Sequence, residues 1–412
     1  MATAKTFILL FPVLSLGFNL PIRIAVCSGG NERSVLQYSV HEKKRSCPDS
    51  TTGPVNKKDS AITYYAAGVV KNNSREYAGA IIYFTKAIQL DSTLASAYLG
   101  RAHAKKKLMD YKSALKDYDL ALKLPLDWEE SYETYFNKAL TQTLLENLKG
   151  AMANFSNAIK INPEYADAYY NRSILKGKFG DYHGELADIN KAISLKPNDS
   201  HAYNSRGIVK CMMRNYTGAL LDYNKAIELD KTNSNAYFNR GVVYYELNEY
   251  LAAVNDFSSA IQIRPDADTY NRRANAKCRM NNFRGAFEDY SAAIKIEPNF
   301  YIAYLNRGQL KFDLKDYQSA IDDYTIAIKL KPDLSIAFYS RGLANGMLKY
   351  YKSEIEDYTE AIEYQPDYQE AYYKRGMARY DLDDKRGGCE DMNRAVKQGS
   401  NIAYEYLIAH CK

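Results

Sequence analysis

Hydrophobic and small residues recur along most of the chain with the spacing of amphipathic helices. In the segment AYNSRGIVKCMMRNYTGALLDYNKAIELDK, the second half carries Ala219, Tyr223 and Ala226 at i, i+4 and i+7. Residues with this spacing lie on one face of an α-helix. The first half carries Tyr203 and Gly207 one helical turn apart. The segment is therefore predicted to form two short amphipathic helices joined by a turn.

This two-helix unit is written ten times in the sequence. The pair Arg206-Gly207 recurs as Arg240-Gly241 after 34 residues, and its equivalents elsewhere follow at intervals of 33, 34 or 37 residues. A fixed helical period of this length indicates a solenoid, in which each repeat packs on its neighbours. We expect the repeats to span residues 60–399, with bounds at 60–93, 94–130, 131–164, 165–198, 199–232, 233–266, 267–299, 300–333, 334–367 and 368–399.

Each repeat places large and small residues at fixed positions. We number every copy so that the residue equivalent to Gly207 is position 8. Position 4 is then aromatic and position 27 is Ala in all ten copies, while position 24 is a large apolar or aromatic residue. A small residue at position 8, one turn from the aromatic at position 4, is expected to let the second helix approach. Proline at position 32 of six copies is expected to end the second helix.

The pattern Y-x2-R-G…A-x3-Y-x2-A…P resembles the tetratricopeptide repeat, with Tyr in place of Trp and Arg in place of Leu. The resemblance covers ten consecutive units and extends to exported bacterial proteins that carry many such repeats. It implies an all-α fold, a right-handed α-solenoid of about ten helix–turn–helix repeats with a C-terminal capping helix. It also implies that the first helices line a concave groove, and that the protein holds other proteins together rather than performing chemistry.

The resemblance further implies that positions 5 and 9 of the first helix face a ligand. Chaperone-binding members present Lys, Asn and Arg there, whereas this chain presents mostly apolar and aromatic residues. Such a surface suits a peptide or a partner helix. The alternative is that a tightly wound superhelix buries much of this face against itself. The candidate partner-binding residues are Tyr170, Ile174, Asn204, Ile208, Phe238, Val242, Asn271, Asn275, Leu305 and Gln309.

Two charged positions also follow the repeat. Position 7 is Arg in eight copies and position 23, on the second helix, is Asp in eight copies. We infer a recurrent ion pair between helices, either within a repeat or to its neighbour. Such a ladder is expected to define register more than it adds net stability.

Two irregularities interrupt the period. Three extra residues fall within 125–131, around the single Trp128, and one residue is missing before Tyr270. We expect both changes to lie in turns, where length variation is tolerated best. Either could mark a partner contact, and neutral drift is the alternative.

Residues 1–27 resemble a secretory signal peptide. Lys5 precedes an apolar run of h-region length, and short residues follow near Cys27. A short membrane anchor and a misassigned start codon are the alternatives. The segment Ile24-Ala25-Val26-Cys27 also resembles a bacterial lipobox, which makes Cys27 a candidate for lipidation, with simple cleavage as the alternative. Residues 28–59 lack a sustained period and are expected to form a flexible linker.

The closing segment resembles the terminal repeat of some exported tetratricopeptide proteins. That resemblance implies a capping helix within 400–412 that solvates the last hydrophobic face. It also leads us to expect a disulfide between Cys389 and Cys411, which suits an oxidising compartment. Two buried thiols are the alternative.

Composition adds little to the functional picture. The net charge of +6 falls to +4 if Lys5 and Arg23 leave with a leader, and acidic and basic residues are interleaved, so we expect no nucleic-acid partner. The five His residues share no metal-ligand spacing, and no phosphate loop or nucleophile elbow is present. We therefore expect no catalytic residue, no cofactor and no metal, and a membrane association only through the leader or a lipid anchor.

These observations predict a non-enzymatic scaffold that binds a peptide or partner protein in its groove. The alternatives are a structural component of a cell-envelope complex without a discrete peptide ligand, and a carbohydrate-binding module. The expected location is exported, periplasmic or envelope-associated, with the cytoplasm as the alternative.

Overall fold

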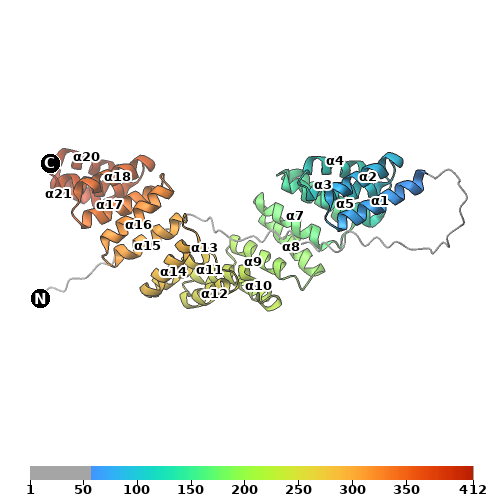
Figure 1. Ribbon diagram of the computed structural model, residues 1–412. Helices are drawn as coiled ribbons and strands as arrows, with labels where there is room; N and C mark the ends of the chain where they lie inside the picture. The colour runs from blue at the N-terminus through green and yellow to red at the C-terminus, as the bar shows by residue number, and fades with distance from the viewer. Residues whose placement is uncertain (1–56, 412) are drawn as a thin grey trace, which may run out of the picture. The chain divides into compact units, whose positions relative to one another are not determined.

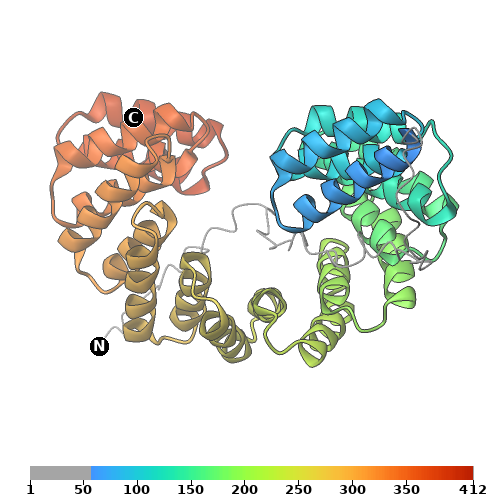
Figure 2. The same cartoon turned by 45° about the vertical axis from the view of Figure 1, so that its right-hand side comes forward.

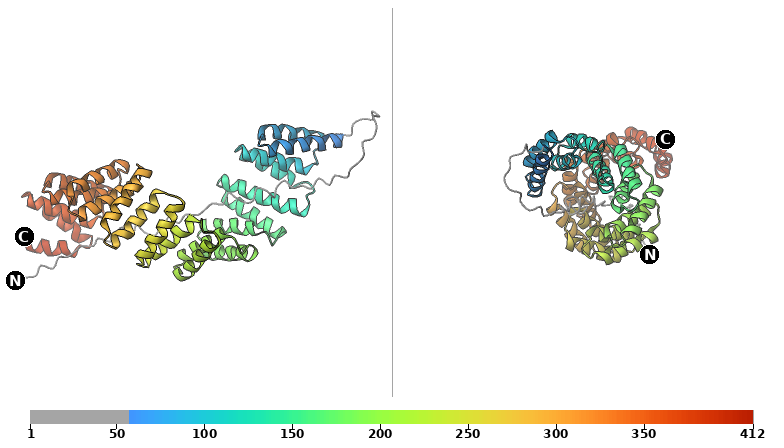
Figure 3. Two further views of the ribbon diagram at one scale, coloured as in Figure 1. Left: turned by 60° about the horizontal axis from the view of Figure 1, so that its bottom comes forward. Right: turned by 90° about the vertical axis from the view of Figure 1, so that its right-hand side faces the viewer.

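The computed structural model describes residues 57–411, which form 21 helices and no strand (Figure 1; Figure 3). The helices are α1 (Lys57–Asn73), α2 (Tyr77–Leu90), α3 (Ala95–Lys107), α4 (Tyr111–Ala121), α5 (Trp128–Leu144), α6 (Leu148–Ile161), α7 (Ala166–Lys178), α8 (Tyr182–Leu195), α9 (Ser200–Met212), α10 (Tyr216–Leu229), α11 (Ser234–Glu246), α12 (Tyr250–Ile263), α13 (Ala267–Arg279), α14 (Phe283–Ile296), α15 (Tyr301–Asp313), α16 (Tyr317–Leu330), α17 (Ser335–Met347), α18 (Tyr351–Tyr364), α19 (Gln369–Asp381), α20 (Lys385–Lys397) and α21 (Asn401–His410).

Successive helices pair into hairpins, and within each of the two compact units each hairpin packs on the next (Figure 2). The predicted all-α architecture of consecutive helix pairs is confirmed. The chain divides into two compact units between Asp230 and Lys231, in the turn that joins the fifth and sixth repeats. The linker expected over 28–59 is three residues too long at its end, because α1 begins at Lys57.

The core of each repeat is the side chain at position 24, held against the residue at position 8. Tyr223, Tyr324 and Tyr358 are among the largest fully buried side chains. A Cβ added to Gly207 would lie 2.6 Å from the ring of Tyr223, which is too close for a real side chain. The backbone of the first helix can therefore lie against the ring only because residue 207 is glycine. Burying one such ring stabilises the fold by roughly 1.5–3 kcal/mol. The small residue therefore lets the second helix approach, as expected, and it does so by accommodating the ring at position 24.

The aromatic ring at position 4 instead packs beneath the arginine at position 7. The guanidinium of Arg206 lies 5.2 Å from the centre of the Tyr203 ring, and the same stacking recurs in the other repeats that carry this arginine. A cation at this distance from an aromatic face is attracted to it by about 0.5–1 kcal/mol when exposed, and by more when desolvated. This local contact explains why arginine at position 7 recurs together with an aromatic residue at position 4.

The arginine at position 7 also makes the ion pair that the sequence led us to expect, and it lies within a repeat. Arg307 donates to both carboxylate oxygens of Asp323, at 2.9 and 2.8 Å, and Lys311 donates to the same carboxylate at 2.8 Å. Equivalent pairs are Arg101–Asp117, Arg172–Asp188, Arg206–Asp222, Arg240–Asp256, Arg273–Asp289, Arg341–Asp357 and Arg375–Asp391.

The same arginine reaches back to the preceding repeat. Arg307 Nη1 donates to the hydroxyl of Ser291 at 3.0 Å, and Arg341 Nη1 donates to Thr325 at 3.1 Å. Burial raises the pKa of Asp357 although the Arg341 guanidinium opposes the shift. The desolvation cost of the buried carboxylate therefore offsets much of the attraction, which supports a role in register.

In two repeats position 12 is Gly and position 20 carries a large side chain in place of the usual Ala. Position 20 is Ala in seven repeats, but it is Glu185 in the fourth and Glu354 in the ninth, where position 12 is Gly177 or Gly346. The carboxylate of Glu354 occupies the space that a side chain at Gly346 would need. Tyr358 Oη donates to this carboxylate at 3.2 Å, and burial raises the pKa of Glu354 from 4.5 to about 7.

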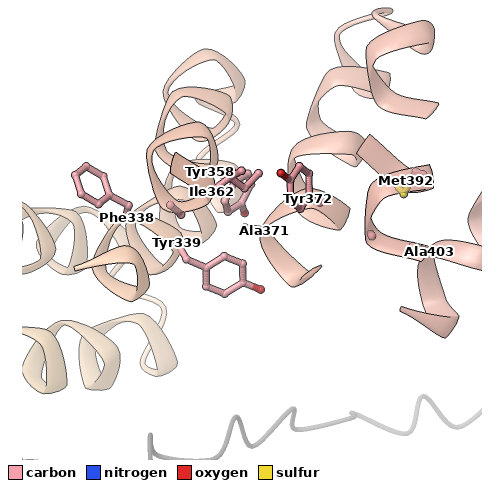
Figure 4. Packing of buried hydrophobic residues seen from close by; sticks show 10 residues of the cluster. Phe338, Tyr339, Tyr358, Ile362, Ala371, Tyr372, Met392 and Ala403 are labelled. Atoms are coloured by element: carbon pink, nitrogen blue, oxygen red, sulfur yellow. The ribbon is translucent and has the colours of Figure 1, made fainter. Parts of the chain in front are cut away.

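The C-terminal repeat is closed by α21, which packs on α20. In this region Tyr358 and Ile362 of α18 lie between side chains of α17 and α19 (Figure 4). Ala403 of α21 is fully buried against the cluster, so the helix covers the last core as expected. Its outer face is not the polar surface that we expected, because Ile402, Tyr404 and Ile408 are 63%, 54% and 56% exposed.

Cys389 at the start of α20 and Cys411 after α21 form a disulfide, with their Cα atoms 5.6 Å apart. The cross-link closes a loop that contains most of α20 and all of α21. A bridge of this kind holds the last two helices together in the unfolded chain as well, which lowers the entropy gained on unfolding. The pairing is the one that the closing segment led us to expect.

The ion-pair ladder predicts a large difference between two adjacent aspartates. Asp323→Asn is expected to lower the free energy of unfolding by about 3 kcal/mol, because Arg307 and Lys311 would keep their charges without a buried counter-charge. Asp322→Asn, at the exposed neighbouring position, is the control and should change stability little. Urea unfolding followed by circular dichroism measures both. Equal effects of the two substitutions would contradict the assigned ladder.

The buried Glu354 predicts a pH dependence of stability. Its folded pKa of about 7 lies above its ordinary value of 4.5, so the folded state binds the proton more tightly between these pH values. Stability is therefore expected to fall as pH rises through this window. Glu354→Gln should unfold at higher urea concentration than the parent chain at pH 8 and at a similar concentration at pH 4. Glu356→Gln, which is exposed on the same helix, is the control. A parent-to-variant difference that does not change with pH would overturn the explanation.

Candidate functional site

The irregularity of the third repeat lengthens both the turn before its first helix and the helix itself. Residues 122–127 join α4 to α5, whereas 162–165 join α6 to α7, so the turn is longer as expected. The helix α5 has 17 residues, whereas α7 and the later first helices have 13.

Asp127 accepts a hydrogen bond from the Glu130 amide at 2.7 Å, and the Glu130 carboxylate accepts one from the Asp127 amide at 3.3 Å. This capping box stabilises the added turn. Trp128 Nε1 donates to the Ile161 carbonyl at 3.1 Å, which ties the start of α5 to the end of α6.

The extended helix helps to enclose a cavity of about 50 Å³ in the N-terminal unit. The cavity lies between the first helices α1, α3 and α5, and α4 contributes one residue. Most of its lining side chains come from positions 2, 5 and 9 or their immediate neighbours. The lining residues are Tyr65, Val69, Asn72, Ser96, Leu99, Gly100, His103, Tyr118, Glu130, Glu133, Thr134 and Asn137.

Hydrogen bonds between the three first helices hold the cavity walls in place. His103 Nδ1 lies 3.2 Å from Asn72 Oδ1 and links α3 to α1. Ser96 Oγ donates to Glu130 Oε1 at 3.2 Å and links α3 to α5. Lys106 Nζ donates to Asn137 Oδ1 at 3.0 Å farther along the same two helices. The polar groups in the walls are therefore largely engaged with one another.

Glu133 is the exception, because its carboxylate makes no hydrogen bond or ion pair with the other described residues, 57–411. Burial raises the pKa of Glu133 from 4.5 to about 7, and the negative charges of Glu129, Asp127 and Glu130 raise it further. The acidic residues of α5 also affect Tyr65 on α1. Burial, together with the charge of Glu130, raises the pKa of Tyr65 to about 12. The cavity thus combines an apolar wall with an uncompensated negative potential.

Most of the candidate partner-binding residues of repeats four to eight are buried in packing. Tyr170 Oη lies 3.0 Å from Ser205 Oγ on the next first helix, and Asn271 Oδ1 accepts a hydrogen bond from Asn306 at 2.9 Å. The side chains buried in this way are Tyr170, Asn204, Ile208, Phe238, Val242, Asn271 and Leu305. Tyr170 and Asn271 thus link first helices of neighbouring repeats, and the burial of the set is in line with the alternative that this face is buried.

Ile174, Asn275 and Gln309 are half-buried. Tyr290 Oη donates to Asn275 Oδ1 at 2.6 Å, and Tyr324 Oη lies 3.4 Å from Gln309 Oε1. These two side-chain amides therefore interact with the hydroxyls of core tyrosines of their own repeats.

Sequence reasoning placed the candidate site in repeats four to eight and missed the cavity in repeats one to three. The signals that could have located it were the helix extension and the pairing of Leu99 with His103 at positions 5 and 9. Glu130 and Glu133 could not be assigned to a cavity from the sequence, because they lie across from α1 only in the folded chain. The predicted signal peptide and Cys27 lie outside the described residues.

Searches of the described residues for other kinds of site found none. Over residues 57–411 no cluster of His, Cys, Asp or Glu has the arrangement of a metal site. In the same range no helix is both long and apolar enough to cross a lipid bilayer.

Family profiles match the chain along most of its repeats. A TPR repeat profile matches residues 215–248, and a tetratricopeptide repeat profile matches residues 234–266 and 301–334. A second tetratricopeptide repeat profile matches 61–94, 132–165 and 166–199. Five of the matched segments each coincide with one helical hairpin, and residues 215–248 span α10 and α11. No curated protein matches the chain.

Several solved structures resemble parts of the fold. A tetratricopeptide repeat protein from Parabacteroides merdae is 19% identical, covering 61% of this chain and 98% of its own, with a TM-score of 0.48. YrrB, described as a TPR protein with an unusual peptide-binding site, is 22% identical over 44% of this chain and 95% of its own, with a TM-score of 0.39. Yeast Tom70 is 16% identical over 85% of this chain and 94% of its own, with a TM-score of 0.41.

The repeat profiles and the consecutive helical hairpins support one assignment. Tetratricopeptide repeats generally serve as scaffolds for protein–protein interaction. The chain is a tetratricopeptide repeat protein.

Proposed function

We propose that the protein is a non-enzymatic scaffold that binds a polypeptide segment along the first-helix face of its N-terminal unit. The observation that carries the proposal is the cavity between α1, α3 and α5. Its walls come from the helix positions that face ligands in proteins built from these repeats. In repeats four to eight the equivalent side chains are mostly buried, so repeats one to three of the N-terminal unit offer the better surface.

The size of the cavity favours a polypeptide over a small molecule. Pockets that hold small-molecule ligands usually measure roughly 300–1,000 Å³. A cavity of about 50 Å³ accepts only a few non-hydrogen atoms. Such a space fits the tip of one side chain, while the rest of a bound segment lies on the surrounding helices. Protein interfaces commonly use such a pocket to anchor one side chain.

We also propose that the protein is exported. The disulfide between Cys389 and Cys411 supports the proposal, because such bonds persist mainly in oxidising compartments. The apolar run near the N-terminus is consistent with a leader.

Filling the cavity is expected to abolish partner binding. Leu99→Trp places an indole in the space between α1 and α5, and we expect affinity for the natural partner to fall at least about tenfold, because the anchor pocket is lost. The partner is recovered from the native host under mild cross-linking with the full chain as bait, identified by mass spectrometry, purified and titrated by calorimetry.

Leu221→Trp is the matched control, because Leu221 lies on the second helix α10 and is 66% exposed. This control variant is expected to bind as the parent chain does, and both variants should keep the parent melting midpoint. A Leu99→Trp variant that is folded and still binds the partner with parent affinity would overturn the proposal.

The export proposal predicts the redox state of the protein in its host. After alkylation in the intact cell, a non-reducing digest is expected to contain one cross-linked peptide that joins Cys389 to Cys411, and reduction should separate it. Cys211 and Cys278, which are free in the structure, serve as internal thiol references. Alkylated thiols at both Cys389 and Cys411 would contradict export.

A further inference from the structure

We propose that the cavity between α1, α3 and α5 takes up a basic side chain, lysine or arginine, of the bound polypeptide. The proposal rests on the proposed function and adds the chemistry of the partner residue. It depends on the shape of the cavity, on the charges around it, and on the aromatic side chain in its wall.

The acidic side chains at the cavity outnumber the basic ones, and one of them, Glu133, has no counter-charge among residues 57–411. Glu130 and Glu133 both line the space, and Asp127 and Glu129 lie on the same first turns of α5. The Glu130 carboxylate is oriented by Ser96 and by its own capping box. Glu133 has no partner among residues 57–411, so its charge is available to a ligand.

The cations near the cavity are already engaged. Lys106 donates to Asn137, and Lys138 on α5 pairs with Asp119 at 2.6 Å. Neither amine contacts the Glu133 carboxylate. A cation brought by the partner would therefore supply the counter-charge that the fold itself does not place there.

Partial burial makes this carboxylate selective for a cation. The raised pKa of Glu133 reflects burial and the three acidic neighbours on its own helix. A cationic group next to it would reverse both effects, because it lowers the energy of the ionised carboxylate in a poorly solvated place. A peptide's terminal carboxylate would meet like charges there, so the cavity disfavours the anionic ligand that chaperone-binding repeats hold.

The walls of the cavity fit the apolar stem and the charged tip of a basic residue. Val69 and Leu99 provide aliphatic surface, and the ring of Tyr65 faces the same space. Lys and Arg pack their methylene groups along such surface and keep the charged end toward polar groups. A cation near an aromatic face is also attracted to the ring. The space of about 50 Å³ accommodates the terminal group of either side chain.

The longer N-terminus of α5 explains why the acidic side chains gather at the cavity beside the third repeat. The three extra residues of the third repeat lengthen α5 at its N-terminus, and Asp127, Glu129 and Glu130 belong to the added turn or to its cap. First helices of normal length, such as α7, begin without this acidic segment. One local insertion therefore produces both the lengthened cavity wall and its charge.

The proposal is tested with pairs of defined peptides that differ only in one functional group, the guanidinium of arginine or the neutral urea group of citrulline. An array of dodecapeptides carries arginine at a central position in varied contexts, and a matched array carries citrulline, the neutral isostere. Binding of the full chain is compared with binding of Glu133→Gln, a substitution that removes the charge but breaks no contact within residues 57–411. Glu228→Gln is the control, because Glu228 is exposed on α10 and pairs with Lys225.

We expect the full chain and the control variant to prefer arginine peptides over their citrulline partners by about tenfold. Glu133→Gln should lose that preference, while its affinity for the citrulline peptides stays the same. Leu99→Trp should lose binding to both arrays. A preference that survives in Glu133→Gln, or equal binding of arginine and citrulline peptides by the full chain, overturns this proposal and leaves groove binding intact. Failure of the full chain to bind any peptide overturns the proposed groove binding, and this inference with it.

Discussion

The close contact between the small residue at position 8 and the buried ring at position 24 is the constraint on which the rest of the structure depends. A Cβ at Gly308 would lie 2.8 Å from the Tyr324 ring, and the same approach is seen between Gly342 and Tyr358. The first helix can therefore lie directly on the second only where position 8 is small. Eight of the ten hairpins bury a large ring at position 24, and Ile189 and Met392 occupy this place in repeats four and ten.

The polar ladder follows from this packing. Because the two helices of a repeat are so close, a carboxylate at position 23 is buried and needs a cation within reach. The arginine at position 7 supplies it, stacks on the ring at position 4 and also donates to the preceding repeat. One side chain thus relates three helices to one another. Since the carboxylate loses hydration on burial, the ladder adds specificity of register at little net gain in stability.

Function depends on a departure from this regular scheme. In repeats four to eight, most side chains at positions 5 and 9 of the first helices, such as Asn204 and Phe238, are buried. At α5 the added helical turn places carboxylates beside the first helices of repeats one and two, and a space remains between them. The same insertion changes the local electrostatics, because its acidic residues add negative charge beside the partly buried Glu133. A binding site can therefore arise where the repeat is interrupted, not where it is most regular.

The sequence by itself determined the helical hairpins, their number and the residues of the core. These features are repeated and local, so spacings such as Ala219, Tyr223 and Ala226 report them directly. The existence of the Arg–Asp pairs could also be predicted, since both residues recur with the same period. Only the tertiary structure decided that each pair lies within a repeat, that Glu354 occupies the space left by Gly346, and which first helices leave a cavity. Those features depend on distances between residues far apart in the chain and on how far each side chain is buried. The pattern of residues along the sequence reports neither quantity.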